Sequence, residues 1–349
     1  METVEQLTRA PGLPADFGPG RVGTRTVVLL VIDGVRPREV FLGVEQERAM
    51  RSGMGAQEIV SADRLMPNLH RLLSTRAAAL GAGGSGIVAS GPDFVSLPGY
   101  IEILTGSRET KCDNNDCTVR KRPTLAHEFA AGHELASVAV FASWGPLARV
   151  VDPDGRMLVS VGRESTNFPR LLDRTLFERG ERADPAPGYG NYRPDRYTAE
   201  LALRYLRTHR PRFMFLSLGD TDEHAHHDDY PHYLEALRFA DWTVGEIART
   251  LAELNARGEP TLLVVTSDHG RSVGFSEHGG EWPESAHSWL IAAGDAVTAR
   301  GIIPGEETYA LADIAPTIRA IAGLPASRVS PSGVVITELF QPQALAYAR

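Results

Sequence analysis

The sequence predicts an α/β fold built on a mostly parallel central sheet. Short apolar runs alternate along the chain with stretches of helical periodicity, which is the pattern of consecutive βαβ units. The strongest apolar runs lie at residues 26–32, 213–218 and 262–265, and acidic residues follow each of them within a few positions. Ligands of open α/β sheets bind at the carboxyl ends of the strands, so these acidic residues are expected to meet in one site.

Length and composition are those of an ordinary globular protein. The chain has 349 residues, of which 42% are hydrophobic, and this suffices for one large domain with a normal core. We expect a polar extension over residues 1–25 and a single domain over residues 26–349, with an irregular cap or insertion around residues 150–195. The formal net charge is −8 and no basic block is present, so a nucleic-acid backbone is a poor candidate partner.

Neither a signal peptide nor a membrane span is visible in the sequence. The N-terminus lacks a basic region followed by an apolar stretch, and no run approaches the roughly 20 apolar residues of a span. We therefore expect no membrane association and a cytoplasmic protein, or a periplasmic or secreted one if a leader precedes this sequence. A homodimer is an open alternative to a monomer. Cys112 and Cys117 are the only cysteines, and a local disulfide and two free thiols are both open.

The N-terminal half supplies two candidate site residues. The strand predicted at residues 26–32 ends at Asp33, whose carboxylate is either a metal ligand or a helix cap. A helix at residues 63–74 and a small, glycine-rich strand at residues 77–90 follow. Ser96 then stands just before a predicted helix, where unpaired N–H groups and the helix dipole favour a negatively charged nucleophile that receives a phosphate. The simpler interpretation of Ser96 is an N-cap.

The rest of the chain continues the alternation of helices and strands. A polar loop at residues 107–122 carries basic and amide side chains, which suit either phosphate binding or a solvated surface. Helices are expected at residues 124–131, 199–208, 233–254 and 313–323, and further strands at residues 136–142 and 287–294.

Metal-type side chains gather after two of the predicted strands. Asp220 and His224 follow strand 213–218 and, four positions apart, can chelate one ion from a single helical turn. Asp268 and His269 follow strand 262–265 and offer an oxygen and a nitrogen, a donor pair suited to zinc, although a helix cap and a surface histidine are the simpler interpretation. The complete set of candidate donors is Asp33, Ser96, Asp220, His224, Asp268, His269 and His278. Such a set suits two ions about 4 Å apart.

Six motifs in this order resemble those of the alkaline phosphatase superfamily, which includes nucleotide pyrophosphatase/phosphodiesterases, sulfatases and cofactor-independent phosphoglycerate mutases. The motifs are Asp33-Gly-Val-Arg36, Ser96-Leu-Pro-Gly-Tyr-Ile-Glu-Ile-Leu-Thr-Gly106, Asp220-Thr-Asp-Glu-His224, Ser267-Asp-His-Gly270, His278-Gly279 and Asp313-Ile-Ala-Pro-Thr317. They extend over the whole of the expected catalytic domain. The resemblance implies a three-layer α/β/α sandwich.

The resemblance also implies the ligands of two divalent metal ions. One ion would be held by Asp220, His224 and His278, with His287 as a second candidate for the last ligand. The other ion would be held by Asp33, Asp268 and His269, and Ser96 would bridge the two ions as the nucleophile. Zinc is the first expectation and manganese the alternative, because imidazoles and oxygens are about equally represented.

Two departures from the family patterns bear on the substrate. Phosphodiesterases of this superfamily usually have a threonine nucleophile and an asparagine three positions later, where this chain has Gly99. Other donors must then bind the phosphate, and the candidates for substrate binding are Asn115, Asn114, Arg108, Lys111 and His287. Sulfatases have an arginine where Tyr100 stands, which counts against a sulfatase.

Taken together, the residues and the resemblance predict a two-metal hydrolase of small-molecule phosphate esters, either a phosphodiesterase or a phosphomonoesterase. Ser96 would form a phosphoserine intermediate. The alternatives are a sulfatase, a phosphotransferase or mutase of the same fold, and a non-catalytic metal-binding protein.

Overall fold

The structure is a computed structural model, which describes residues 25–82, 86–108, 111–131, 133–151, 157–165, 173–305, 307–325 and 332–340. The expected extension at residues 1–25 therefore lies almost entirely outside the described residues. Among the helices that the structure does describe, none is both long enough and apolar enough to cross a membrane.

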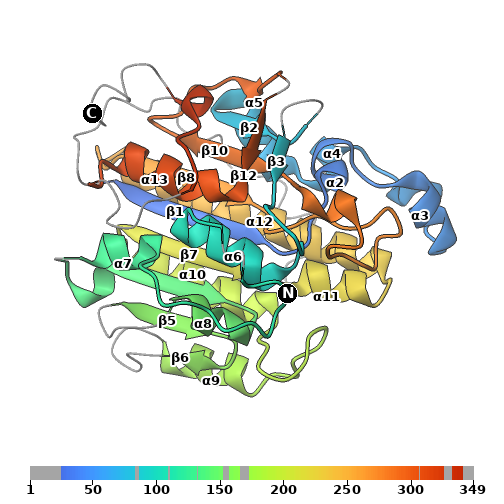
Figure 1. Cartoon of the computed structure of the whole chain (residues 1–349), viewed down its shortest axis with the longest axis horizontal. Helices are drawn as coiled ribbons and strands as arrows, with labels where there is room; N and C mark the ends of the chain where they lie inside the picture. The colour runs from blue at the N-terminus through green and yellow to red at the C-terminus, as the bar shows by residue number, and fades with distance from the viewer. Residues whose placement is uncertain are drawn as a thin grey trace.

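A nine-stranded sheet forms the centre of the described fold (Figure 1). Its strand order is β11-β2-β10-β8-β1-β7-β4-β5-β6, and β8, β1, β7, β4 and β5 run parallel. The antiparallel strand β10 joins β8 to β2. The bounds are β1 Thr26–Ile32, β2 Ala77–Leu80, β4 Val138–Ala142, β5 Leu158–Val161, β6 Glu164–Ser165, β7 Phe213–Leu218, β8 Thr261–Thr266, β10 Leu290–Gly294 and β11 Gly301–Ile302. The predicted mostly parallel sheet is confirmed.

Helices cover both faces of this sheet and give the three layers. Alternate residues of β1 enter two separate apolar cores, with Val27, Leu29 and Val31 on one face and their neighbours on the other, as the period of two in a strand requires. The first core packs against α6 (Ser96–Thr105), α7 (Leu125–Ala130), α8 (Ala148–Val151) and α13 (Ile314–Ala322). The second packs against α5 (Pro67–Thr75), α10 (Asp195–His209) and α12 (Tyr230–Asn255). The expected α/β/α sandwich is confirmed.

Shorter elements complete the described chain. They are helices α2 (Pro37–Phe41), α3 (Gln46–Arg51), α4 (Ala62–Leu65), α9 (Arg174–Glu181) and α11 (Asp220–His226), and strands β3 (Gly86–Val88), β9 (His287–Ser288) and β12 (Thr308–Ala310). The last three strands form a separate small sheet in the order β12-β3-β9. The strand expected at residues 77–90 is thus divided between two sheets.

The segment at residues 150–195 differs from the irregular cap that its sequence suggests. Its strand β5 pairs with β4, and β6 pairs with β5, so both extend the edge of the central sheet. The turn after α9 then brings Tyr189 and Tyr192 to the carboxyl end of the parallel strands, where they line a pocket. Proline and glycine in this segment concealed two short strands, which are defined only by the pairing of β5 with β4 and of β6 with β5.

Candidate metal-dependent active site

Asp33 is placed by the end of β1 and by a turn that only glycine fits. Its carboxylate is 4% exposed, and its backbone carbonyl accepts a hydrogen bond from Thr221. Gly34 follows with φ +62°, and a Cβ at this position would lie 2.2 Å from an oxygen of Asp222. The glycine therefore allows the chain to turn while the Asp222 carboxylate approaches the β1 terminus.

The end of β8 supplies Asp268 and His269, both fully buried. Asp268 Oδ1 accepts a hydrogen bond from the Gly34 amide at 3.2 Å, which ties this turn to the neighbouring strand. The Nδ1 atom of His269 lies 2.8 Å from the Gly270 carbonyl, so Nδ1 carries the proton and donates. The Nε2 atom of His269 is thereby directed at Asp33 and Asp268, at 3.4 and 3.5 Å.

Asp33, Asp268 and His269 form a group that we call the buried triad. One donor atom from each lies within 4.8 Å of the others. Asp268 Oδ2 is buried and has no hydrogen-bond partner among the described residues. Burial and then the Asp33 charge raise the pKa of Asp268 well above its ordinary value. Burial lowers the pKa of His269, but Asp268 and Asp33 outweigh it and raise that pKa to about 10. A divalent cation would replace the protons held by this dry group and balance the charge of its two carboxylates.

Ser96 lies beside the buried triad, at the first residue of α6. Its Oγ is 3.2 Å from His269 Nε2 and 3.4 Å from Asp33 Oδ1. A Cβ on Gly99 would lie 2.5 Å from the Asp268 carbonyl oxygen, so this glycine permits α6 to pack directly against the β8 turn. That close packing explains why glycine stands where an asparagine was expected.

A second group, which we call the rim triad, consists of Asp222, His226 and His278. The Nε2 atom of His226 lies 3.0 Å from Asp222 Oδ2 and 3.0 Å from His278 Nε2. His278 Nδ1 donates to the Phe94 carbonyl at 3.0 Å, and burial and then His269 hold the pKa of His278 well below its usual range. His278 Nε2 also lies 3.9 Å from Asp222 Oδ1, so two imidazoles and a carboxylate, which are ligand types of zinc, lie close together.

The two triads are adjacent. The rings of His269 and His278 stack with centroids 4.0 Å apart, and donor atoms of Asp222, His269 and His278 also lie within 4.8 Å of one another. Burial alone would raise the pKa of Asp222, but Arg271 and His226 outweigh it and hold that pKa well below its ordinary value. The residues present therefore fit two neighbouring divalent ions, one at each triad.

The expected grouping of Asp220 and His224 with His278 is wrong. Asp220 Oδ1 accepts hydrogen bonds from the Tyr192 hydroxyl at 2.7 Å and from the Asp195 amide at 3.2 Å, so it supports the surrounding loop. His224 stacks on His232 of α12 instead, with ring centroids 5.4 Å apart. Helix α11 instead directs Asp222 and His226, each two residues further along the chain, toward the site.

Asp222 and His226 are four residues apart, as are Asp220 and His224. Spacing in the sequence therefore could not show which of these two pairs faces the site. One further signal was present in the sequence. The family motif pairs its histidine with a preceding glycine, and Ala225-His226 has a small residue there, whereas Glu223-His224 does not. Ala225 is fully buried in the structure, which gives the small residue a packing reason.

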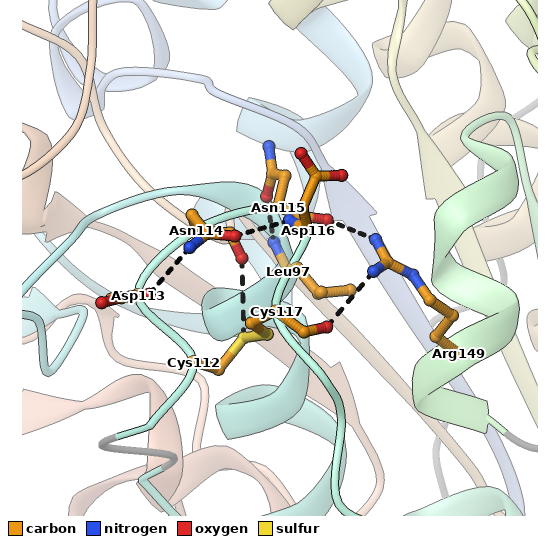
Figure 2. Close-up of a disulfide and its surroundings, with 8 residues drawn as sticks. All are labelled: Leu97, Cys112, Asp113, Asn114, Asn115, Asp116, Cys117 and Arg149. Atoms are coloured by element: carbon orange, nitrogen blue, oxygen red, sulfur yellow. Dashed lines mark hydrogen bonds between the residues drawn. A yellow bond between two sulfur atoms is a disulfide. The ribbon is translucent and has the colours of Figure 1, made fainter.

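Asn115 reaches the N-terminus of α6, next to Ser96, from a loop closed by a disulfide (Figure 2). Its Oδ1 accepts a hydrogen bond from the Leu97 amide at 2.9 Å, next to Ser96. Cys112 and Cys117 form the disulfide, with Cα atoms 5.1 Å apart, which resolves the open alternative. Arg149 of α8 donates to the backbone carbonyls of Asn115 and Cys117 and holds the loop from the other side.

The other predicted substrate-binding residues do not line the pocket. Asn114 is exposed and bonds to Asp113 and to the Asp116 amide within its own loop. Arg108 and Lys111 are also exposed. His287 lies in β9 with its residue exposed and its backbone paired with β3. Of the five candidates, the structure brings only Asn115 to the nucleophile.

The pocket above Ser96 encloses about 430 Å³ of empty space, including its open mouth. The described residues that line it are Asp33, Ser96, Asn115, Trp144, Tyr189, Tyr192, Gly219, Asp222, Glu223 and His226. Sequence reasoning missed its aromatic wall and Glu223, because these residues carry no motif and reach the pocket from separate loops.

Comparison with known proteins agrees with this geometry. Residues 158–324 match the model of the Sulfatase family, a segment that contains Asp222, His226, Asp268, His269 and His278. The described fold has solved counterparts, among them a protein in the alkaline phosphatase superfamily from Vibrio parahaemolyticus (TM-score 0.53, 13% identity, 93% of this chain and 73% of that chain). The chain has the alkaline phosphatase superfamily fold.

Two further superfamily structures are similar to this chain at low identity. A phosphonate monoester hydrolase from Silicibacter pomeroyi has a TM-score of 0.56 and 15% identity, covering 89% of this chain and 76% of that chain. A 2-O GAG sulfatase, BT1596, has a TM-score of 0.55 and 13% identity, covering 93% of this chain and 74% of that chain. No curated protein sequence matches the chain significantly.

Tyr100 stands where the resemblance to sulfatases would require an arginine. Its buried hydroxyl donates to Asp33 Oδ2 at 2.8 Å and lies 2.6 Å from Ser217 Oγ. Burial and then the Asp33 and Asp268 charges raise the pKa of Tyr100 well above its ordinary value, so the phenol stays protonated and donates. Tyr100 thus orients a carboxylate of the buried triad and has no cationic group to offer to an anionic substrate.

Proposed function

We propose that this protein is a metal-dependent hydrolase of phosphate esters with Ser96 as its nucleophile. One observation carries the proposal: Ser96 Oγ lies 3.2 Å from His269 Nε2 and 3.4 Å from Asp33 Oδ1, at the floor of an open pocket. Asp33 and His269 belong to the buried triad, whose two carboxylates and imidazole suit a divalent cation, so a hydroxyl placed there is next to a candidate cation site. Such a hydroxyl is activated for attack on a phosphoryl group.

The two triads would hold the two ions. Asp33, Asp268 and His269 would bind one, and Asp222, His226 and His278 the other. The ions would lower the pKa of the nucleophile and offset the charge that develops on the phosphoryl oxygens. Zinc remains the first choice because three of the six donors are imidazoles, and manganese is the alternative.

The chain itself contributes the position and environment of the nucleophile. Ser96 occupies the N-terminus of α6, where the helix dipole favours the negative charge of an attacking oxygen and of a phosphoserine. The side-chain oxygen of Asn115 accepts a hydrogen bond from the Leu97 amide. This contact orients the carboxamide beside the nucleophile and leaves the Nδ2 group as a donor for a phosphoryl oxygen. Hydrolysis of the phosphoserine then regenerates the hydroxyl.

The charges around the pocket favour a phosphodiester or phosphonate monoester over a phosphomonoester. Asp33, Asp222 and Glu223 line the pocket, and no lysine or arginine does so among the described residues. A diester carries one negative charge, whereas a monoester dianion presents a second charge that needs another cationic partner. Beyond the two ions, the described pocket offers none.

A three-substrate assay tests this reaction class. Nitrophenyl phosphate, bis-nitrophenyl phosphate and nitrophenyl sulfate would be compared on protein with measured metal content. We expect about two metal ions per chain and fastest turnover of bis-nitrophenyl phosphate. Turnover of the sulfate alone would contradict the proposal and favour a sulfatase, the second candidate, which the match to the Sulfatase family supports.

Mass spectrometry tests the nucleophile separately. Enzyme quenched at low pH during turnover should carry a phosphate on the peptide containing Ser96, and the Ser96→Ala variant should lose on the order of 10⁴-fold in rate. A phosphate adduct on another peptide, for example at Thr105, would refute the role of Ser96. An aldehyde mass at Ser96 in the resting protein would indicate a sulfatase.

A further inference from the structure

The histidine-rich segment after β7 contains a group of metal-type side chains that the proposed active site does not use. His224 lies in α11, Asp229 in the following turn, and His232 in the first turn of α12. One donor atom from each lies within 4.8 Å of the other two. None of the three belongs to the triads or lines the active-site pocket.

The turn between α11 and α12 holds these donors in a closed backbone loop. The Asp229 amide donates to the His224 carbonyl at 3.0 Å, which closes the turn. Asp229 Oδ1 accepts the His232 amide at 3.3 Å and caps α12, while Oδ2 lies 2.6 Å from His232 Nδ1 and 4.0 Å from His224 Nδ1. Helix capping therefore uses one carboxylate oxygen and directs the other between two imidazoles.

Capping explains Asp229 and His232 but leaves His224 without a role. The His224 side chain is only 21% exposed, and its ring makes no hydrogen bond to any described residue. It lies nearly parallel to the His232 ring, at 19° and 5.4 Å between centroids. A half-buried imidazole facing a second imidazole across a carboxylate gains a partner if an ion binds between them.

We propose that His224, Asp229 and His232 form an auxiliary metal site, separate from the catalytic one, that fastens α11 to α12. Two imidazoles and one carboxylate are a donor set of zinc, with a fourth position open to water. Because α11 also carries Asp222 and His226, an ion here fixes the helix that supplies two members of the rim triad. The site does not depend on Ser96 or on the reaction proposed above.

The test is metal stoichiometry of the full chain at micromolar free zinc, held by metal buffers, together with thermal unfolding. The wild-type protein is compared with His232→Ala, which removes an exposed ligand. The matched control is His227→Ala, another exposed histidine of the same segment, whose ring contacts the Glu223 carbonyl instead. We expect wild type and His227→Ala to bind one more zinc per chain than His232→Ala, with a zinc-dependent rise in unfolding temperature that His232→Ala lacks.

Two outcomes would overturn the auxiliary site. Equal zinc content in wild type and His232→Ala would show that the cluster binds no ion, and equal losses in both histidine variants would indicate unspecific binding by surface histidines. If His232→Ala fails to fold, His224→Gln carries the same expectation. Failure of the proposed function is distinguished by Asp268→Asn, which should lose catalytic metal yet keep the zinc that depends on His232.

Discussion

The buried triad and the rim triad offer similar donors but are built in different ways. Asp33, Asp268 and His269 have side chains that are 0–5% exposed and follow directly from strands β1 and β8. In the rim triad, the side chains of Asp222, His226 and His278 are 12%, 40% and 6% exposed. Two of these come from the short helix α11 and one from a loop.

This difference decides how well each triad could be read from the sequence. A residue just past a parallel strand lies at the edge of the sheet whichever way its side chain points. The sequence therefore predicted that Asp33 and Asp268 lie close together, and in the structure they do. A helix offers several faces, and two pairs with the same spacing on α11 point in different directions. The end of a strand fixes where a ligand residue lies. A ligand residue on a helix can be placed only when the direction of the helix face that carries it is also known.

The largest effect should come from His269, a member of the buried triad whose donor atom also lies within 4.8 Å of those of Asp222 and His278. His269→Ala should lower kcat by on the order of 10⁴-fold, because it removes a ligand and the neighbour of Ser96 Oγ. Bound metal should fall below two ions per chain in elemental analysis. A variant that keeps both its metal and its full rate would contradict the assignment of the buried triad.

The register of α11 is tested by two histidines on the same helix. His226→Ala should lower kcat/KM by on the order of 100-fold and weaken one metal site, because a ligand of the rim triad is lost. His224→Ala should retain kcat/KM within about threefold. The reverse ranking of these two variants in steady-state kinetics would restore the grouping first expected from the sequence.

The disulfide-closed loop allows a smaller and more local test at the nucleophile. Asn115→Ala should lower kcat/KM by about 10- to 100-fold, as expected for a lost hydrogen bond to a charged group, with unchanged metal content. Arg108→Ala is the matched control, because this exposed residue precedes the same loop and does not line the pocket. Equal effects of both variants on kcat/KM would mean that the loop acts through charge and not through the Asn115 contact.

The same loop also predicts a dependence on redox state. Cys112→Ser in the full chain should reproduce part of the Asn115→Ala loss, because the disulfide and Arg149 hold Asn115 against the Leu97 amide. The melting temperature of the variant, measured beside its kinetics, separates a misplaced Asn115 from general unfolding. Unaltered kinetics in Cys112→Ser would show that Arg149 alone positions the loop.

The smallest expected effect lies outside both triads and separates pH effects on stability from those on the metal site. Burial raises the pKa of Glu102 in α6 from its ordinary value of 4.5 to about 7. The folded state therefore holds this proton more tightly than the unfolded state, and stability should fall as pH rises from about 4.5 to 7. Glu102→Gln should remove that part of the fall, up to about 3 kcal/mol, in denaturant unfolding at pH 5 and pH 8. An identical pH dependence in both proteins would exclude Glu102 as its source.

Much of the fold was readable from the sequence because it depends on local patterns. The buried strands β1, β7 and β8 appear as apolar runs, and the period of two distributes β1 between the two cores. The helix that begins at Ser96 also follows from local signals, with Pro98 in its first turn. By contrast, β5 and β6 are short, so only the pairing of β5 with β4 and of β6 with β5 defines them as strands.

The features of the candidate site can also be separated into those that local sequence predicts and those that depend on tertiary packing. Sequence alone determined that carboxylates and a histidine follow β1 and β8, and that a serine begins a helix nearby, because each of these facts is local. Tertiary structure decided that Asp222 and His226 face His278, that Asn115 reaches the Leu97 amide, and that an aromatic wall closes over Ser96. The physical reason is distance along the chain. Side chains from segments far apart in the sequence meet there, and which of them meet depends on how α11 and the loops pack against the sheet.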